Sequence, residues 1–211
     1  MIEQEQFKKH MKAGIIEESE SPIGVNNVFV PKKTLDAQGR PEIGTDRDFR
    51  PINAATIRDS YPLEDMNKIV EWLSKRKIFS SMDMRDGYWG VSLRPSDRYL
   101  TAVKTSMGLM QFTRMTMGLR NAGPFYQRVI EKTLRKYLWL LAVAYQDDVS
   151  VATMGEREHV EALRKIFELL WKKKLRMKLS KCNFGVAKME GLGYEIGFNH
   201  TSYRRIPTGK H

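Results

Sequence analysis

The residues best suited to chemistry in this sequence are two adjacent aspartates, Asp147 and Asp148, which separate two apolar segments. Segments 140–145 and 149–152 are nearly free of polar side chains, so they are predicted to be buried strands joined by a hairpin with both carboxylates at its tip. Acids in a turn are often merely solvated, because Asp hydrogen-bonds to its own backbone there. In a buried hairpin, however, two carboxylates repel each other unless a cation lies between them, which favours a cation site.

A third carboxylate, Asp83, lies near the end of another apolar segment, 78–84. Three carboxylates at two strand ends would form an oxygen-rich site of the kind that Mg²⁺ prefers. Two such ions about 3.5–4 Å apart can activate an attacking hydroxyl and stabilise a leaving phosphate, and this chemistry needs no side-chain nucleophile. We therefore expect two Mg²⁺ ions, with Mn²⁺ as a substitute. Asp83, Asp147 and a neighbouring backbone carbonyl would ligate them, and Asp148 would support the site.

The net charge, the cysteine content and the lengths of the apolar segments restrict the kinds of partner and compartment that suit this protein. The 36 Lys and Arg residues outnumber the 25 Asp and Glu residues, giving a formal charge of +11 that favours a polyanion such as nucleic acid. A single cysteine, Cys182, excludes an intramolecular disulfide and a cysteine-based zinc site, and suits a reducing compartment. The polar N-terminal segment is unlike a secretory signal, and the longest apolar run, 137–145, is too short to span a bilayer. We expect a protein that is not secreted and has no membrane partner.

Hydrophobic periodicity and turn residues predict a mixed α+β fold, with helices packed on one face of an antiparallel sheet. Helices are expected over 3–16, from Pro62 through Leu73, from Asn121 to Tyr137, and after a capping box of Thr153 and Glu156. Strands are expected at 28–30, where Pro31 would stop the strand, and at 46–52, 78–84, 140–145, 149–152 and 191–196, with a long turn over 34–44. The buried face of the last helix would comprise Val160, Leu163, Phe167 and Leu170, and core positions are expected for Trp72, Trp139 and Trp171.

Seven motifs resemble, in the same order, those of retroviral and retrotransposon reverse transcriptases. The run Tyr145-Gln146-Asp147-Asp148 is similar to the family's Tyr-x-Asp-Asp box, and Asp83 stands where the family keeps its first metal-binding Asp. The other matches are Lys12-Ala13-Gly14-Ile15-Ile16, Asp48-Phe49-Arg50-Pro51-Ile52-Asn53, Met117-Gly118-Leu119-Arg120-Asn121-Ala122 with Tyr126-Gln127-Arg128, Lys181-Cys182-Asn183-Phe184 and Leu192-Gly193-Tyr194. Each is weak alone, but together they cover nearly the whole chain, and the nearest group is the gypsy-type LTR retrotransposon polymerases.

The resemblance implies the fingers and palm of a right-hand polymerase, with an antiparallel palm sheet. Residues 1–80 would form the fingers and the start of the palm. Residues 81–211 would be mostly palm, with a fingers return around 90–120 and an end at the primer grip. Thumb and RNase H would be absent, so the isolated chain is expected to be a poor polymerase. The implied partners are an RNA or DNA template with its primer, dNTPs, and a larger polyprotein with protease, RNase H and integrase, in a cytoplasmic virus-like particle or the nucleus.

The resemblance also assigns roles outside the three acids. Tyr88, five residues after Asp83, is similar to the aromatic residue that screens the incoming sugar for a 2′-hydroxyl, although most such aromatics simply pack in a core. Nucleotide contacts are implied for Lys32, Lys33, Arg47, Tyr88, Met117, Gly118 and Gln146. Template or primer contacts are implied for Arg50, Asn53, Gln127, Tyr145, Leu192 and Gly193. Without the resemblance, Lys32 and Lys33 would be read as solvated. The basic segment 172–181 fits a helix C-terminus as well as it fits a nucleic-acid contact.

The sequence departs from the family pattern at four places. Gln146 replaces a residue that is usually apolar, which bears on rate and nucleotide choice rather than on metal binding. Gly44 stands where the family has an Arg that grips the triphosphate, a role that Arg40 or Arg47 would have to take. Pro124 comes one place later than usual, and the chain ends near Pro207, where a thumb would begin.

Three functions are compatible with these residues. A templated DNA polymerase is the leading interpretation. A non-catalytic nucleic-acid-binding remnant is disfavoured by the intact acids, and a templated RNA polymerase is disfavoured by Tyr88, whose bulk excludes ribose.

Overall fold

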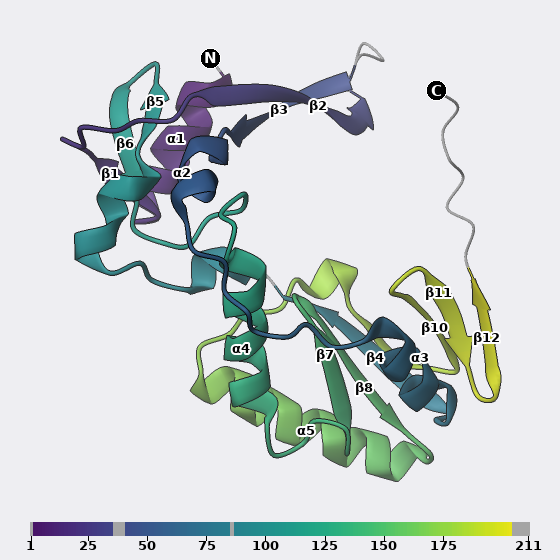
Figure 1. Ribbon diagram of the computed structural model, residues 1–211. Helices are drawn as coiled ribbons and strands as arrows, with labels where there is room; N and C mark the ends of the chain where they lie inside the picture. Colours follow the sequence, from purple (N-terminus) through teal and green to yellow (C-terminus); the bar gives the residue numbers. More distant parts are fainter. Residues whose placement is uncertain (1, 36–40, 85–86, 204–211) are drawn as a thin grey trace. The chain divides into compact units, whose positions relative to one another are not determined.

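The computed structural model describes residues 2–35, 41–84 and 87–203, which fall into two compact units (Figure 1). Unit 1 comprises Met1–Asp59 and Tyr88–Ala122, and unit 2 comprises Ser60–Gly87 and Gly123–His211. The assignment of fingers and palm to residues 1–80 and 81–211 stays a prediction.

Unit 2 is built on a four-stranded antiparallel sheet in the order β7-β8-β4-β9. Its strands are β4 (Ile78–Asp83), β7 (Ala142–Tyr145), β8 (Asp148–Thr153) and β9 (Asn183–Val186). Residues 149–153 of β8 are all buried, so both faces of this strand are covered and its sequence lacks polar alternation. The mixed α+β class expected from the sequence is confirmed.

Helices cover both faces of this sheet, whereas the sequence pattern predicted helices on one face only. Helix α5 (Glu156–Lys172) contacts β8 and β4, and its His159 is hydrogen-bonded to Ser80 of β4. The neighbouring residue, Phe79, points to the opposite face and packs there against Leu73 of helix α3 (Met66–Ser74). A second sheet of β10 (Lys188–Gly191), β11 (Tyr194–Gly197) and β12 (His200–Tyr203) also lies on that side, because Met189 and Ile196 belong to the same core cluster as Phe79.

Four helices differ from their predicted bounds or faces. Helix α1 (Ile2–Lys12) ends before residue 16, where a strand begins. Helix α3 starts at Met66 rather than Pro62, because the Asp65 side chain caps it by accepting a hydrogen bond from the Asn67 amide. The capping box predicted for α5 is absent: Gly155 is the N-cap residue, and the Thr153 hydroxyl is hydrogen-bonded to Gly155 and His159 instead. Helix α4 (Ala122–Leu134) ends before Tyr137, and the Asn121 side chain, expected to cap it, bonds to the backbone of Ile57 and Asp59.

The buried stripe of α5 is offset from the predicted one. It consists of His159, Ala162, Ile166 and Leu170, whereas Val160 is 58% exposed. Trp171 follows on the solvent side with 85% exposure, so the prediction that it lies in the core is wrong. A polar histidine inside the stripe explains the error, since hydrophobic periodicity alone passes over it.

The segment 191–196, predicted to be a single strand, is a hairpin. Gly191 of β10 pairs with Tyr194 of β11, and the turn between them is formed by Leu192 and Gly193, both with positive φ (54° and 83°). A two-residue connection with positive φ suits the twist of an antiparallel pair.

Unit 1 contains helix α1 (Ile2–Lys12) and a three-stranded sheet in the order β1-β6-β5. Its strands are β1 (Ile16–Glu18), β5 (Val103–Thr105) and β6 (Gly108–Phe112). Its core cluster includes Phe7, Ile16, Phe49, Val103 and Phe112. Short 3₁₀ helices η1 (Gly87–Gly90) and η2 (Pro95–Thr101) lie at the unit boundary and within unit 1 respectively, and η3 (Leu179–Lys181) lies in unit 2.

A two-stranded ribbon of β2 (Asn27–Leu35) and β3 (Pro41–Arg47) completes unit 1. Strand β2 continues past Pro31 instead of stopping there, with an irregular register between Pro31 and Leu35, because a two-stranded ribbon leaves one side of each strand free of ladder bonds. The strand predicted over 46–52 is wrong beyond Arg47. Helix α2 (Arg50–Ala55) follows, with Pro51 in its first turn, where a missing N–H is tolerated. No helix in the three described ranges is long and apolar enough to cross a membrane.

Candidate active site

A tight hairpin between the edge strand β7 and the central strand β8 of unit 2 carries Asp147 and Asp148. Tyr145 of β7 pairs with Asp148 of β8, so Gln146 and Asp147 form the two-residue turn. Gln146 has φ of 54°, in the left-handed region that costs a non-glycine residue about 1–2 kcal/mol. The surrounding structure must therefore hold this turn in place.

Helix α4 supplies that support through Gln127, which is completely buried. Its Oε1 accepts a hydrogen bond from the Gln146 amide at 2.5 Å, and its Nε2 donates to the Ala144 carbonyl at 3.0 Å. The same Nε2 donates to Glu131 Oε1 at 2.7 Å, and the other Glu131 oxygen accepts from the Tyr61 hydroxyl. Gln127 was predicted to contact template or primer; here its amide holds both sides of the turn.

The third acid reaches the same place through strand pairing. Asp83, the last residue of β4, lies directly opposite Asp148 in the antiparallel ladder, and the Met84 amide donates to the Asp147 carbonyl at 3.1 Å. The structure thus brings Asp83, Asp147 and Asp148 together at one end of two neighbouring strands.

The three acids influence one another electrostatically. The pKa of Asp148 is raised, first by burial and then by the negative charges of Asp147 and Asp83, while Lys181 acts in the opposite direction. Lys181 is the last residue of η3, and its Nζ lies 3.1 Å from Asp83 Oδ2. One ammonium group therefore faces three carboxyl groups, and the remaining negative charge favours a further cation.

This cluster fits a divalent cation in charge and in donor type, but its side chains are not arranged around a common point. Across the described ranges, no set of three or more His, Cys, Asp or Glu side chains is placed so that it could hold a metal ion. One reason is visible at Asp83, whose carboxylate is directed to Lys181. Ligation would therefore require the carboxylates to change rotamer.

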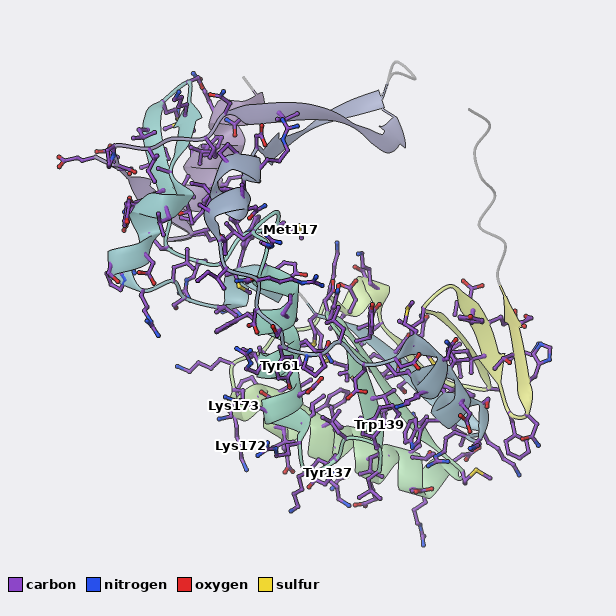
Figure 2. The ribbon with its side chains drawn as sticks, viewed as in Figure 1. Tyr61, Met117, Tyr137, Trp139, Lys172 and Lys173 are labelled. Carbon is purple, nitrogen blue, oxygen red and sulfur yellow. The ribbon has the colours of Figure 1, made fainter. Side chains whose placement is uncertain are left out.

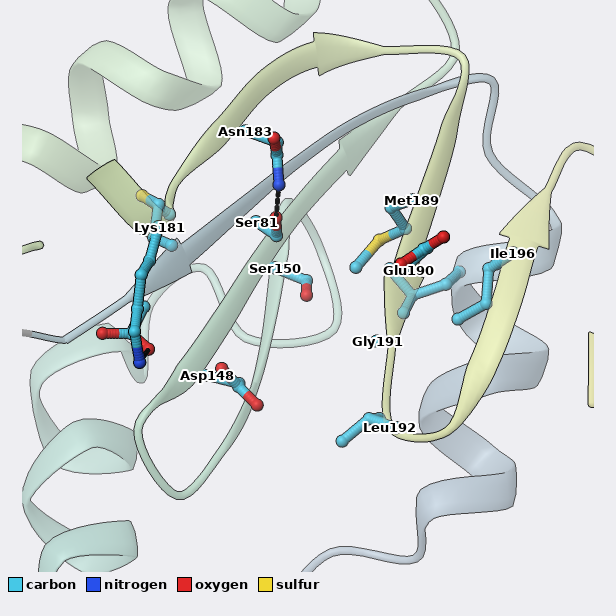
Figure 3. Close-up of a pocket in the computed structure, with 13 residues that line it drawn as sticks. Ser81, Asp148, Ser150, Lys181, Asn183, Met189, Glu190, Gly191, Leu192 and Ile196 are labelled. Carbon is cyan, nitrogen blue, oxygen red and sulfur yellow. Dashed lines mark hydrogen bonds and ion pairs between the residues drawn. The ribbon is translucent and has the colours of Figure 1, made fainter. Parts of the chain in front are cut away.

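A cavity of about 200 Å³ opens beside the acids, between the four-stranded sheet and the β10–β11 hairpin (Figure 3). Asp83, Asp148 and Lys181 line it from one side, and Gly191 and Leu192 line it from the other. Figure 3 shows that Asp148 and Leu192 approach the cavity from different elements. The space therefore connects the acids with the turn that the sequence analysis assigned to primer contact.

The remaining predicted residues of unit 2 lie close to this cavity. Tyr145 and Leu192 are partly buried and pack against the core cluster of α3, β4 and β8. Gly193 completes the turn with φ of 83°, and a Cβ added there would meet no atom within 4 Å. The sequence motif at 192–194 thus marks a real turn beside the acids.

In unit 1, the motifs at 48–53 and 117–122 form one joined structure. Asn53 Nδ2 donates to the Gly118 carbonyl, and Asn53 Oδ1 accepts from the Arg120 amide, both at 2.7 Å. Gly118 has φ of 85°, and a Cβ added to it would lie 3.3 Å from Phe49, so glycine suits this position. Met117, beside it, is 64% exposed (Figure 2).

Two arginines predicted to bind ligands have internal partners. Arg50 forms a two-pronged ion pair with Asp48 at 2.7 Å for each bond, and this bond lowers the pKa of Asp48 and raises that of Arg50. The guanidinium of Arg47 lies over the rings of Phe7 and Phe112, 5.8 and 5.3 Å from their centres, in the core of unit 1. A triphosphate contact by Arg47 would need a different rotamer.

Three predictions rest on positions that the structure does not test. Lys32 and Lys33 belong to β2, but their side chains lie outside the described residues, as does Arg40. Tyr88 is half-buried in η1 of unit 1, and its role as a sugar gate stays a prediction.

Sequence reasoning missed the supporting residues Glu131, Tyr61 and the role of Lys181. Lys181 is 98 positions from Asp83, and no local pattern links the two. The available signals were the basic segment that contains Lys181 and the motif Lys181-Cys182-Asn183-Phe184, and neither indicates a contact with Asp83.

Comparison with known proteins places the chain in a defined family. A family model described as "Reverse transcriptase (RNA-dependent DNA polymerase)" matches residues 30–196. The retrovirus-related Pol polyprotein from transposon gypsy of Drosophila melanogaster is 32% identical over 196 residues, covering 93% of this chain and 19% of that polyprotein. The transposon Tf2-3 polyprotein of Schizosaccharomyces pombe is 26% identical over 195 residues, covering 91% of this chain and 14% of the polyprotein.

Solved structures share the fold. The foamy viral protease-reverse transcriptase in complex with double-stranded DNA matches with a TM-score of 0.84 at 20% identity, covering 95% of this chain and 34% of that chain. The same kind of protein with an RNA/DNA hybrid matches with a TM-score of 0.82 at 19% identity, covering 95% and 26%. The chain thus spans only a small part of each of these larger proteins. The length of the family match and the identity to the gypsy polyprotein establish that this chain belongs to the reverse transcriptase (RNA-dependent DNA polymerase) family.

Proposed function

We propose that this chain carries out templated nucleotidyl transfer, adding dNTPs to a primer on an RNA or DNA template with two divalent ions. The observation that carries the proposal is the register pairing of Asp83 with Asp148, which puts both beside Asp147. Carboxylates gathered at strand ends are the usual holders of such ions in phosphoryl transfer. Family membership and the nucleic acid in the foamy viral complexes support the same choice.

In this mechanism, Asp83 and Asp147 would hold the ions, with Asp148 in support. When bound, Mg²⁺ or Mn²⁺ would supply the Lewis acidity that activates the primer hydroxyl and offsets phosphate charge. The residues of this chain provide the positions: Gln127 fixes the turn that carries Asp147, and the hairpin at 192–193 borders the cavity where a primer end would lie. Positioning and charge neutralisation are the main needs of phosphoryl transfer.

The wider setting is also a proposal. We expect the chain to act within a polyprotein that also carries protease, RNase H and integrase, in a cytoplasmic virus-like particle or in the nucleus. The curated relatives it matches are polyproteins of transposons.

A non-catalytic nucleic-acid-binding role is the second candidate. It is favoured by one observation, that the side chains of the acid cluster are not gathered around a common point in the described part of the chain. The polymerase requires the carboxylate of Asp147 for nucleotide addition, whereas a non-catalytic binding protein does not.

Primer extension decides between them. The chain is used in excess over a labelled primer–template with Mg²⁺ and dNTPs, so that single additions are detected. Asp147→Asn is compared with Asp97→Asn, an exposed aspartate of η2 whose loss changes the net charge equally. Extension by the wild type and by Asp97→Asn, with none by Asp147→Asn, supports the polymerase. Primer–template binding without extension by any of the three proteins would instead support the non-catalytic role.

The same assay tests the choice of sugar. With ribonucleotides in place of dNTPs, the wild type is expected to extend the primer poorly, because Tyr88 was assigned as the aromatic that excludes the 2′-hydroxyl. Tyr88→Ala should raise ribonucleotide use while dNTP addition continues. Equal use of both sugars by the wild type would favour a templated RNA polymerase.

A further inference from the structure

A second cavity, of about 350 Å³, lies along helix α4 and is separate from the acids. It is lined by Tyr61, Arg128, Glu131, Lys132, Arg135 and Leu138. Figure 2 shows Tyr61 beside α4. None of these residues lines the cavity at Asp83 and Asp148. Only Arg128 belongs to a sequence motif, Tyr126-Gln127-Arg128.

The side chains that line this cavity carry mainly positive charge. Three basic side chains line it, against a single acid, Glu131. Both oxygens of Glu131 are already hydrogen-bonded, one to the Tyr61 hydroxyl and one to Gln127. Within the described residues, Lys132 and Arg135 have no carboxylate at ion-pair distance, and both are exposed. Two cations therefore remain available to a ligand.

Tyr61 orders the third cation. The Arg128 guanidinium lies 4.6 Å from the centre of the Tyr61 ring, and the bond to Glu131 fixes the ring itself. That bond raises the pKa of Tyr61, and the charges of Arg128 and Arg135, which line the same cavity, oppose the rise. A stacked, oriented guanidinium loses less freedom when it binds phosphate than a mobile one does.

The spacing of the three cations suits a polymer of phosphates. Arg128 and Lys132 are one helical turn apart, and Arg135 follows three residues later, just past the end of α4. Seven residues of helix span about 10 Å. One strand of duplex DNA carries one charge per 3.4 Å along the helix axis, so cations spread over this length can meet more than one phosphate of a bound strand.

We propose that this cavity binds the phosphodiester backbone of a nucleic-acid strand, as a docking site distinct from the acid cluster. That the cavity takes a phosphate-bearing anion follows from its own charges. The choice of nucleic acid as the anion rests on the proposed function. Binding here would hold a strand against unit 2 without contributing to the reaction itself.

The test measures affinity for a single-stranded oligonucleotide at several salt concentrations, without dNTPs or divalent ions. The full chain is compared with Lys132→Glu/Arg135→Glu and with a matched control, Arg164→Glu/Lys165→Glu, which makes the same charge change on the exposed side of α5. Each single-strand phosphate contact contributes about 0.7 to the slope of log affinity against log salt. The cavity variant is therefore expected to lose at least about 1.4 of slope and roughly 20-fold in affinity at 0.1 M salt relative to the control.

A milder pair, Lys132→Gln/Arg135→Gln, carries the test if charge reversal unfolds the chain, and thermal melting identifies that case. Equal slopes for the cavity variant and the control would overturn the proposal. Inorganic tripolyphosphate is the second probe. If it binds wild type but not the cavity variant, while the oligonucleotide slope is unchanged, the site takes a small anion and the nucleic-acid assignment is wrong. Because these measurements involve no catalysis, their failure is distinguishable from a failure of primer extension.

Discussion

Replacing Gln127 with methionine should disable the hairpin that carries Asp147 without unfolding unit 2. Methionine has a similar volume and fills the buried site, but it can neither accept from the Gln146 amide nor donate to the Ala144 carbonyl or Glu131. Two backbone groups and one carboxylate oxygen lose their partner together.

The magnitude follows from what is left unpaired. A buried polar group without a partner costs about 1–3 kcal/mol, and water can reach part of this turn, so a loss of about 3 kcal/mol in the free energy of unfolding is expected. That is less than the roughly 5–15 kcal/mol of a typical domain, so the variant should stay folded. The positive φ of Gln146 then loses its support, and a shift of Asp147 by 1 Å would slow nucleotide addition by about 100-fold.

Urea unfolding and single-turnover primer extension measure the two effects. The matched control is Gln111→Met in β6 of unit 1, where the amide accepts from the Ser19 hydroxyl and donates to Glu17, both at 2.7 Å. That site is only partly buried, so a loss of about 1 kcal/mol and near-normal extension per folded molecule are expected. If Gln127→Met unfolds at the same urea concentration as the wild type, the argument from the buried amide is refuted.

Two further predictions concern titratable groups. The pKa of Asp148 is raised in the folded chain, so the folded state loses stability as pH rises and Asp148 ionises. Asp148→Asn should therefore raise the melting temperature at pH 8 in metal-free buffer but not at pH 3. An equal shift of the melting temperature at both pH values would contradict this prediction. Burial lowers the pKa of His159 below 6.5, so the stability of the folded chain should fall as pH drops from about 6.5 toward the pKa that His159 has in the folded state. In melting scans from pH 7 to 5, His159→Gln should make this fall in melting temperature less steep. An unchanged slope would rule out His159 as the cause of the fall.

Local sequence was sufficient to find the hairpin of the site. The apolar runs on either side of Asp147 and Asp148 became β7 and β8, and the turn has two residues because Tyr145 pairs with Asp148. The run of buried residues in β8 reflects cover on both faces, which is why its pattern is continuous rather than alternating. A hairpin of this kind can be predicted from local sequence because its two strands and its turn are neighbours along the chain.

The rest depended on contacts between distant residues. Helix α2 is too short for its own propensity to determine it, and it is joined to the loop at 118–120 through Asn53. The stripe of α5 was misassigned because His159 is buried through hydrogen bonds to Ser80 and Thr153, a pairing that no spacing rule indicates. The counter-ion of Asp83 was unforeseen for the same reason.

The pairing of Asp83 with Asp148 depends on the register between β4 and β8, and that register is held from both faces of the sheet. A slip of one residue would turn Asp83 to the opposite face, because side chains alternate along a strand. Phe79, opposite Ala152, is locked into the core cluster under α3, and Ser80, opposite Val151, is hydrogen-bonded at 2.7 Å to His159 of α5. A slip would expose Phe79 to the α5 side and leave His159 without Ser80, so two unfavourable changes oppose it together. Residues at the far end of β4 therefore help to determine that three carboxylates meet at its other end.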